Sequence, residues 1–327
     1  AHPHPNIALA DCDLRAPITG AGKVLCIGMN YREHCVEQNV PLPEEPVVFS
    51  KFGSCITGPR APVRFDSRLT QCMDYEVELA VVIGSRCRRC RKDTALSYVA
   101  GVTVAHDVSA RDWQLQRNGG QWLLGKAMDD FCPLGPHLVT LDDVEDLNNL
   151  RVTCRLNGRT VQDSNTNEFI FDIPAVLEHV SRFCTLEPGD VILTGTPSGV
   201  GCFRTPPLWL KHGDVVECEI EGLGVVRNRM VDAAAETKAE TKAAGAAGSN
   251  NKCPSSSSTA SKATPLPMFI GTYTTDKGFV DGKGRGVYPC TLDAASGEMR
   301  LAGKPFVLAN PTYVCLNREK TALYAVS

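Results

Sequence analysis

Most apolar residues in the first two thirds of the chain fall into short runs separated by Gly, Pro, Asp and Asn. Runs of roughly four to eight residues that are rich in Val and Ile are typical of β-strands. The pattern predicts strands at residues 24–27, 47–52, 76–83, 99–105, 151–157, 190–194, 215–220 and 224–228. A further strand should begin at Val161 and form a hairpin with the one before it, because Asn157-Gly158 is a strong turn signal.

Two segments favour helices instead. Residues 31–39 predict a short helix, which Pro41 and Pro43 would end. Residues 174–183 carry apolar side chains at helical spacing and predict an amphipathic helix. Because strands outnumber helices and do not alternate regularly with them, we expect an α+β fold built on antiparallel or mixed sheets.

The last third of the chain has a different character. Residues 232–267 are low in complexity and nearly lack large apolar side chains, so we expect a flexible linker there. Residues 268–327 regain apolar and aromatic side chains and predict four short strands, at 268–274, 286–293, 310–316 and 322–326. Four such strands suit one blade of a β-propeller. We therefore expect an extension at 1–22, a main domain at 23–231, the linker, and a single all-β blade at 268–327.

The composition is that of an ordinary soluble globular protein, with 43% hydrophobic residues and a formal net charge of -3 over 327 residues. This charge argues against nucleic acid or an anionic membrane surface as a partner. No apolar run approaches the roughly 18 residues that a membrane-spanning helix needs. The sequence begins with Ala, so we expect natural residues upstream, and no targeting peptide is visible.

The 15 cysteines are scattered singly through apolar strands and loops. This usage favours reduced thiols in an intracellular protein over a disulfide framework. Cys87 and Cys90 form a CxxC in a basic stretch, but no second Cys/His pair at zinc spacing accompanies it. We therefore expect a solvated basic loop rather than a metal or redox site.

Carboxylates on one predicted strand give the clearest chemical signal. Side chains alternate faces along a strand, so Asp74, Glu76 and Glu78 should point one way and the intervening residues into the core. The apolar residues that follow predict a central strand, where like charges are costly unless a cation lies between them. Oxygen ligands favour Mg²⁺, Mn²⁺ or Ca²⁺ over zinc. The alternative is an exposed polar face.

Two further polar residues strengthen the metal interpretation. Asp107 ends the apolar strand at 99–105 and could supply a third carboxylate, whereas His106 beside it suits the core. Lys126 follows Gly125 among apolar residues and could meet an anionic substrate. The alternative for Lys126 is a surface lysine that extends its ammonium into solvent.

Six segments resemble the fumarylacetoacetate hydrolase family in their residues and in their order, and together they cover nearly the whole of 23–231. The resemblance implies a mixed β-sheet roll. It rests on Ile27-Gly28-Met29-Asn30-Tyr31 with His34, Phe49-Ser50-Lys51, Glu76-Val77-Glu78, His106-Asp107-Val108-Ser109-Ala110-Arg111-Asp112, Gly125-Lys126, and Thr194-Gly195-Thr196-Pro197-Ser198-Gly199-Val200.

The resemblance also implies site roles. Glu76, Glu78 and Asp107 match the ligands of a Mg²⁺ or Mn²⁺ ion. His34 and Glu37 lie at i and i+3 of the predicted helix, on one face, and match a dyad that activates water.

The remaining matched positions concern the substrate. Lys126 matches a lysine that stabilises an enolate or oxyanion. Arg111, Gln114 and Thr196 match contacts to the carboxylate of the substrate. Lys51 is also a family position, which we place with the substrate-binding residues.

These matches predict an enzyme that acts on a small 2-oxo acid or 1,3-dicarbonyl acid through a metal-stabilised enolate, in a homodimer located in the mitochondrion or cytoplasm. Hydrolysis of a C–C bond in an acylpyruvate is the preferred reaction. Tautomerisation or decarboxylation of oxaloacetate at the same site is the alternative, and an inactive metal-binding scaffold is an alternative of another class.

The C-terminal segment resembles the first blade of a seven-bladed propeller lactonase, through Gly271-Thr272-Tyr273, Asn310-Pro311 and Leu323-Tyr324-Ala325-Val326. Repeat architectures generally need at least about three units to bury a continuous core. We therefore expect a fragment or truncated gene fusion without a complete lactonase site, in which this blade could at most serve as an interaction module.

Overall fold

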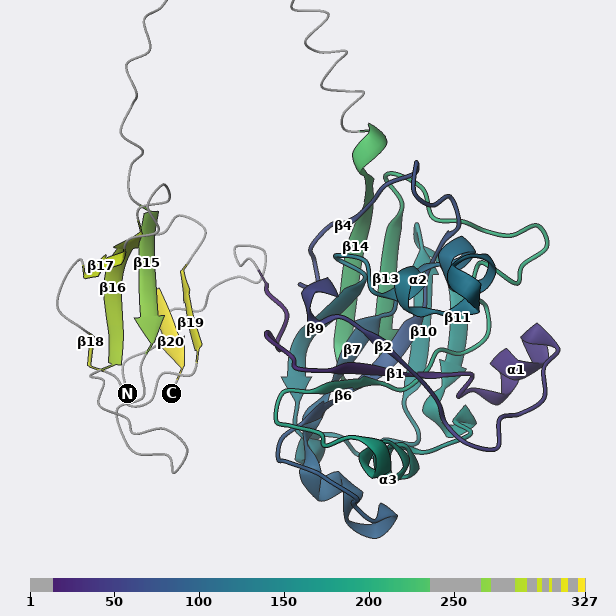
Figure 1. Cartoon of the computed structure of the whole chain (residues 1–327), viewed down its shortest axis with the longest axis horizontal. Coiled ribbons are helices and arrows are strands. Elements are labelled where there is room, and N and C mark those ends of the chain that lie inside the picture. Colours follow the sequence, from purple (N-terminus) through teal and green to yellow (C-terminus); the bar gives the residue numbers. More distant parts are fainter. Residues whose placement is uncertain are drawn as a thin grey trace, which may run out of the picture. The chain divides into compact units, whose positions relative to one another are not determined.

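The computed structural model describes residues 14–235 and six strands between residues 266 and 326 (Figure 1). The chain divides into two compact units, residues 14–249 and residues 250–327 with 1–13. The expected extension at 1–22 lies partly, and the expected linker at 232–267 mostly, outside the described residues.

The larger unit contains a seven-stranded mixed sheet. Its strands lie in the order β2-β1-β12-β6-β7-β9-β3. Their bounds are β1 Val24–Gly28, β2 Val47–Lys51, β3 Ile56–Thr57, β6 Val77–Ile83, β7 Val99–His106, β9 Cys132–Val139 and β12 Val191–Leu193. The pairs β1 with β12 and β3 with β9 are parallel, and the others are antiparallel. Every residue of β6 is buried, which confirms it as a central strand.

A five-stranded sheet packs against the first one. Its order is β11-β10-β13-β14-β4. The bounds are β4 Val63–Phe65, β10 Arg151–Leu156, β11 Arg159–Asn165, β13 Val215–Ile220 and β14 Gly224–Asp232. Strands β13 and β14 contact β7 of the first sheet, and β10 contacts β6 (Figure 1). The small ladder of β5 Met73–Asp74 with β8 Ser109–Ala110 lies outside both sheets.

Helices in the described residues are few. They are α1 Arg32–Gln38, α2 Leu123–Lys126 and α3 Ile173–Phe183, with short 3-10 or π segments at η2 Gly53–Cys55, η3 Lys92–Tyr98, η4 Asp112–Gln116, η5 Asn118–Gly120, η6 Leu141–Asp143 and η7 Thr166–Glu168. Helix α3 begins after Asp172, whose carboxylate accepts a hydrogen bond of 2.9 Å from the N–H of Ala175. It buries one apolar stripe and packs on η3.

These elements confirm the predicted strands and helices of the larger unit, with small shifts at their ends. The turn Asn157-Gly158 has φ values of 51° and 80°, as a two-residue hairpin requires. Strand β14 extends four residues beyond the prediction because Met230, Val231 and Asp232 pair with β4, a partner distant in sequence.

The CxxC segment corrects one expectation. The side chains of Cys87 and Cys90 are buried, and the N–H of Cys90 donates to the hydroxyl of Ser181 on α3 at 3.0 Å. Neighbouring Arg86 and Arg91 remain exposed. The predicted solvated loop is therefore wrong for the two thiols, which dock the basic loop onto the helix.

The smaller unit is described only through its strands. Strand β15 Leu266–Gly271 pairs with β16 Gly286–Leu292, which also pairs with β17 Met299–Leu301 and β18 Phe306–Val307. Strand β19 Tyr313–Leu316 pairs with β20 Leu323–Val326. The four predicted strands correspond to β15, β16, β19 and β20, while β17 and β18 were not predicted.

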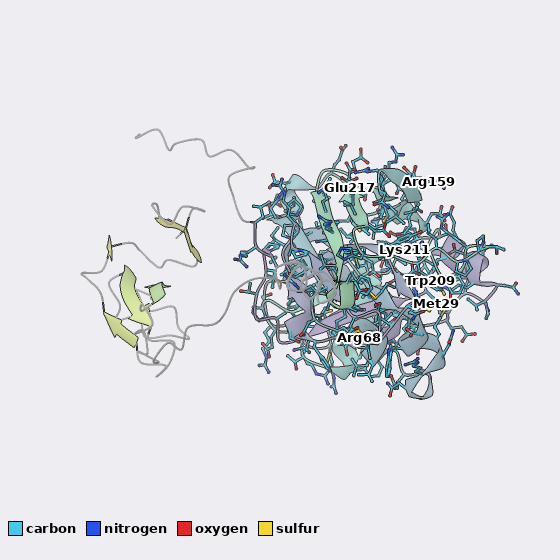
Figure 2. The ribbon with its side chains drawn as sticks, turned by 90° about the horizontal axis from the view of Figure 1, so that it is seen from above. Met29, Arg68, Arg159, Trp209, Lys211 and Glu217 are labelled. Carbon is cyan, nitrogen blue, oxygen red and sulfur yellow. The ribbon has the colours of Figure 1, made fainter. Side chains whose placement is uncertain are left out.

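The mixed sheets and the scarcity of helices confirm the α+β fold class. In the described part of the chain, no helix has the length and apolar character needed to cross a bilayer. Charged side chains such as Arg68, Arg159 and Lys211 lie on the surface of the larger unit (Figure 2). Other charged side chains of the larger unit are buried, among them Glu76, Glu78 and Lys126.

Candidate metal centre and active site

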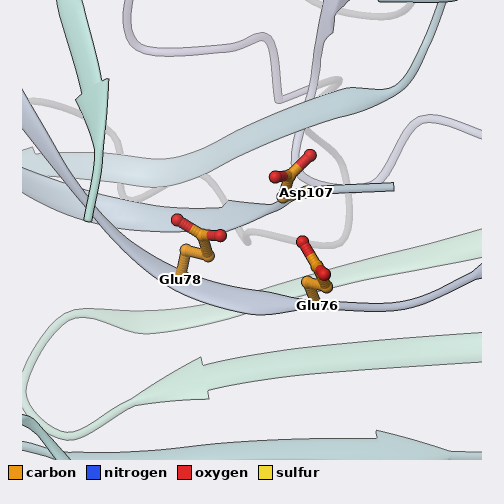
Figure 3. A group of neighbouring side chains, drawn as sticks. All are labelled: Glu76, Glu78 and Asp107. Carbon is orange, nitrogen blue, oxygen red and sulfur yellow. The ribbon is translucent and has the colours of Figure 1, made fainter. Parts of the chain in front are cut away.

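Three carboxylates meet where β6 and β7 lie side by side. Glu76 and Glu78 flank Val77 at the start of β6, and Asp107 directly follows β7. The N–H of Asp107 donates to the carbonyl of Glu76 at 2.9 Å, so the strand register fixes their approach. One oxygen from each carboxylate lies within 4.8 Å of the others, and all three point into a common space (Figure 3).

Burial excludes the exposed polar face. Glu76 is 4% exposed, Glu78 is 2% exposed and Asp107 is fully buried. Asp74 was expected on the same face, but it belongs to β5 and turns to a different set of partners. Its carboxylate accepts hydrogen bonds from Arg111 Nε at 2.8 Å and from the backbone N–H of Gly201 at 2.7 Å.

Cationic side chains surround two of the three carboxylates. Lys126 Nζ lies 2.5 Å from Glu76 Oε2 and 2.8 Å from Asp107 Oδ2. Arg111 Nη2 donates to Glu76 Oε1 at 2.7 Å. Lys51 Nζ lies 2.6 Å from Asp107 Oδ1 and also donates to the carbonyls of Val108 and Lys126. Lys126 is 1% exposed, so it is not a surface lysine.

Glu78 differs from its two neighbours because no described cationic side chain pairs with it. Its Oε2 accepts a hydrogen bond of 2.6 Å from the N–H of Gly195. Burial, and then the charges of Asp107 and Glu76, raise the pKa of Glu78 well above its usual value. Burial also opposes ionisation of Glu76, but Lys126 and Arg111 outweigh it and lower the pKa of Glu76 to about 2.

The donor set fits a hard divalent cation. Four buried carboxylates, those of Asp74, Glu76, Glu78 and Asp107, face three buried cations, those of Lys51, Lys126 and Arg111. If all four carboxylates are ionised, one negative charge has no partner, and Glu78 is the carboxylate without a cationic side chain beside it. A divalent cation bound by these oxygen atoms would stabilise the ionised form of Glu78, and Mg²⁺ and Mn²⁺ prefer such ligands.

His34 and Glu37 form the expected pair on α1. His34 Nδ1 lies 2.9 Å from Glu37 Oε2, and Glu37 Oε1 accepts from the N–H of Gly199 at 2.9 Å. The glutamate therefore ties the histidine to the glycine-rich loop 195–201. The imidazole also contacts Phe203, with ring centroids 6.0 Å apart. The second ring nitrogen of His34, Nε2, takes no part in the hydrogen bond with Glu37.

A pocket opens above the carboxylates. Polar lining comes from His34, Gln38, Glu76, Glu78, Arg111, Gln114, Lys126 and Thr196, and apolar lining from Ile27, Met29, Phe49, Leu115, Trp122 and Phe203, beside the backbone of Gly28. Gln114 Oε1 accepts from Arg111 Nη1 at 2.8 Å. Gly195 has a φ of 103°, and a Cβ there would lie 2.8 Å from the Cβ of Asn30, so the loop can pack this closely against Asn30 only with glycine.

The ten residues assigned from the sequence all join this one network. Seven of them line the pocket: His34, Glu76, Glu78, Arg111, Gln114, Lys126 and Thr196. Asp107 completes the carboxylate cluster, and Glu37 contacts His34. Lys51 was expected among the substrate contacts, but its ammonium lies behind Asp107 and does not line the pocket.

Sequence reasoning missed the residues that connect this network to the rest of the fold. Asp74 orients Arg111, and Gln162 on β11 holds Thr196. Phe49 and Trp122, with ring centroids 5.2 Å apart, form part of the apolar wall. A buried Gln in a polar strand has no local signature, because only the packing of the second sheet brings Gln162 to the site.

Comparison with protein families gives two matches. The family model described as fumarylacetoacetate (FAA) hydrolase C-terminal matches residues 23–231. The model described as lactonase, 7-bladed beta-propeller matches residues 267–327.

Similar proteins carry names that refer to oxaloacetate. The protein named oxaloacetate tautomerase FAHD2A, mitochondrial, of Homo sapiens is 56% identical over 227 residues, which are 69% of this chain and 72% of that protein. The Xenopus laevis protein named oxaloacetate tautomerase fahd2, mitochondrial, is 54% identical over 225 residues, 69% of this chain and 70% of that protein.

Solved structures show the same fold. The fumarylacetoacetate hydrolase from Exiguobacterium antarcticum matches with a TM-score of 0.62 and 40% identity, over 67% of this chain and 78% of that one. The 2-hydroxyhepta-2,4-diene-1,7-dioate isomerase from Mycobacterium marinum matches with a TM-score of 0.60 and 39% identity, over 69% of this chain and 80% of that one.

Proposed function

Because this chain belongs to the fumarylacetoacetate hydrolase family, we propose that it is a divalent-metal-dependent enzyme that converts a small 2-oxo acid through an enolate. The observation that carries the proposal is the buried cluster of Glu76, Glu78 and Asp107, in which no described cationic side chain pairs with Glu78. These three residues would hold Mg²⁺ or Mn²⁺. A cation there supplies Lewis-acid stabilisation of an enolate.

The reaction that we favour is keto–enol tautomerisation of oxaloacetate. Two relatives above 50% identity carry this activity in their names. The reaction moves one proton from the carbon beside the ketone to the ketone oxygen, or the reverse, and consumes no water. Lys126, buried beside the carboxylates, would stabilise negative charge on that oxygen, and His34 would accept or return the proton at carbon.

We propose that three further residues of the pocket orient the substrate. Arg111, Gln114 and Thr196 line the pocket, and we propose that they receive the carboxylate of the 2-oxo acid. Arg111 is held by Asp74, Glu76 and Gln114 before any substrate binds, so little side-chain entropy is lost on binding. Lys51 would act indirectly, by fixing Asp107 and the carbonyl of Lys126.

A tautomerisation assay tests this function. Freshly dissolved enol oxaloacetate absorbs in the ultraviolet, and the enzyme with Mg²⁺ or Mn²⁺ should accelerate the decay of that absorbance over the buffer rate. Chelator should return the rate to that of buffer. A rate with metal-loaded enzyme that equals the rate with metal alone would refute the proposal.

Hydrolysis of an acylpyruvate is the second candidate, and the His34–Glu37 pair is the observation that favours it. His34 would take a proton from water, whose oxygen attacks the acyl carbonyl. The C–C bond then breaks, and the departing enolate is reprotonated to pyruvate, with a carboxylic acid as the other product. His34→Ala should reduce this hydrolysis about 10²–10⁴-fold, as expected for loss of a general base. An unchanged rate would rule His34 out as the base.

Assembly and location are inferred by analogy. We propose a homodimer, as the family resemblance implies, and a mitochondrial location, since both named relatives are mitochondrial. We also propose that 23–231 is the catalytic domain and that 232–267 is a linker to a partial lactonase-like blade. Limited proteolysis within 232–267 should release an N-terminal piece with full turnover; lost turnover would overturn these boundaries.

A further inference from the structure

Gln162 lies at the contact between the second sheet and the proposed metal site. Its side chain is 1% exposed and makes three hydrogen bonds. The backbone N–H of Val77 donates to Gln162 Oε1 at 3.1 Å. Gln162 Nε2 donates to Thr196 Oγ1 at 2.8 Å and to the carbonyl of Pro197 at 2.9 Å. One amide thus joins the strand of the glutamates to the loop that lines the pocket.

An irregularity in β11 directs Gln162 to this place. Cys154 on β10 pairs with Gln162, but the next residue pairs with Thr160, so Val161 is an extra residue in β11. Such a bulge re-aims the side chain that follows it. The carbonyl of Val161 accepts from Arg204 Nη2 at 2.6 Å, and a Cβ at Gly199 would lie 2.2 Å from it. The backbone of the bulge at Val161 therefore lies so close to the glycine-rich loop that Gly199 has no room for a side chain.

Both backbone polar groups of Val77 are hydrogen-bonded to side chains of the Gln162 network. While the N–H of Val77 is held by Gln162, its carbonyl accepts from the hydroxyl of Thr196 at 3.0 Å. Val77 stands between Glu76 and Glu78, so its peptide groups set the positions of both carboxylates. On the opposite edge, the pairing of Val77 with His106 sets the distance to β7.

The same contacts determine which polar group of Thr196 can bind a substrate carboxylate. Its hydroxyl proton is given to Val77, and Gln162 donates to its oxygen. The hydroxyl is therefore not free to donate to a substrate carboxylate. No hydrogen bond to another described residue uses the backbone N–H of Thr196, and Thr196 lines the pocket.

We propose that Gln162 is a positioning residue that couples metal binding to substrate binding, an inference that rests on the proposed function. Through Val77 it holds Glu76 and Glu78 at the separation that a divalent cation needs. Through Thr196 it turns a backbone N–H toward the substrate carboxylate. Groups that orient metal ligands typically change metal affinity or activity about 10–100-fold when they are removed.

The first experiment uses Gln162→Met in the full chain, because methionine has a similar length and no strong donor or acceptor. We expect the Kd for Mn²⁺, measured by calorimetry, to rise about tenfold or more, and the KM for oxaloacetate to rise with it. Ser181→Ala is the matched control, since Ser181 is an equally buried polar side chain on α3 whose partners are Cys90 and Glu178. The control should melt lower and keep the wild-type Kd and KM.

Thr196→Val and the double variant separate positioning from loss of stability. If Gln162 acts on substrate through Thr196, adding Gln162→Met to Thr196→Val should raise the KM no further, while the Kd for Mn²⁺ still rises. Gln162→Asn, which keeps the amide but is one methylene shorter, takes the place of Gln162→Met if that variant does not fold. Additive effects on KM, or wild-type Kd and KM in the Gln162 variants, would overturn the inference.

The wild-type measurements distinguish this inference from the function on which it rests. A wild-type chain that binds no Mn²⁺ and converts no 2-oxo acid removes the proposed function, and the inference with it. A wild-type chain that binds and turns over, beside Gln162 variants that behave in the same way, removes the inference alone.

Discussion

Two groups of acidic residues lie in the larger unit, and their surroundings are opposite. Glu76, Glu78 and Asp107 are buried, and lysine or arginine side chains contact all but Glu78. The second group lies around the surface depression beside η6. It consists of Asp143, Glu145, Asp146 and Glu221, all of them exposed.

The comparison shows how burial changes the interactions that a carboxylate requires from the protein. The exposed carboxylates face water, and the hydrogen bonds that they accept come from neutral groups, such as the hydroxyl of Thr140 to Asp143 at 2.9 Å and the N–H of Arg151 to Glu221 at 3.3 Å. The buried carboxylates have lost that solvation and must receive compensation from the protein. Asp107 receives it from two lysines and Glu76 from Lys126 and Arg111, which leaves Glu78 as the group that a metal ion would satisfy. The number of acidic residues alone would not distinguish the buried group from the exposed one.

The largest effect should come from Glu78→Gln. Removal of this carboxylate takes away a ligand, so turnover of oxaloacetate should fall to the rate of metal alone. In chelator the variant should melt no lower than the wild type, because burial and the charges of Asp107 and Glu76 already disfavour the ionised form of Glu78 and the amide can keep the hydrogen bond from Gly195. Glu76→Gln is the matched comparison: it should also lose turnover, but it should melt lower in chelator because Lys126 and Arg111 lose a partner. Equal melting temperatures for the two variants would contradict this account of the cluster.

Lys51→Met should be the most destabilising of the substitutions considered. It leaves Asp107 with one cation instead of two and leaves the carbonyls of Val108 and Lys126 without their donor. Breaking a buried ion pair costs about 3–5 kcal/mol in the free energy of unfolding. Urea denaturation of the metal-free protein measures this loss. A cost near that of an exposed ion pair, below about 1 kcal/mol, would show that Lys51 does not support the site.

Metal addition should stabilise the wild-type chain by a smaller amount. At about one hundred times its Kd, a ligand that binds only the folded state adds about 2.7 kcal/mol. For a domain of this size that corresponds to a rise of about 5–10 °C in the melting temperature of the larger unit. Scanning calorimetry with Mg²⁺ and with chelator measures it. If neither changes the melting temperature, the carboxylate cluster is not a metal site.

The exposed acidic group should give the smallest effect. Asp143→Asn and Glu145→Gln remove carboxylates that water already solvates, so the metal Kd, turnover and melting temperature should stay at their wild-type values. Calorimetric titration with Mn²⁺ checks the first and the oxaloacetate assay the second. A weaker Kd in either variant would mean that metal binds at the surface depression, and the contrast between the two groups would fail.

Much of the site could be predicted because its geometry is local. Alternation along a strand places Glu76 and Glu78 on one side of β6, and the spacing of His34 and Glu37 places them on one face of α1. These relations follow from backbone periods that any strand or helix shares. The turn Asn157-Gly158 likewise needs positive φ at both residues, which Asn and Gly accept at least cost.

Alternation alone misplaced Asp74 because it assumes one continuous strand. The chain bends between β5 and β6, and Asp74 turns to Arg111 and the loop at Gly201. The thiols of Cys87 and Cys90 show the same limit, since composition marks their loop as solvated while α3 covers the two side chains. In both cases a contact with a segment distant in sequence decided where the side chain lies.

The sequence by itself determined the strands, the α+β class and the residue types that can hold a divalent metal. Tertiary structure decided which of those residues meet. Strand order places Asp107 beside Glu76, burial of Lys51 and Lys126 sets the charge balance, and the bulge in β11 brings Gln162 to Val77. Short-range periodicity is written into neighbouring residues, whereas these contacts depend on sheets that form only when the whole domain packs and excludes water.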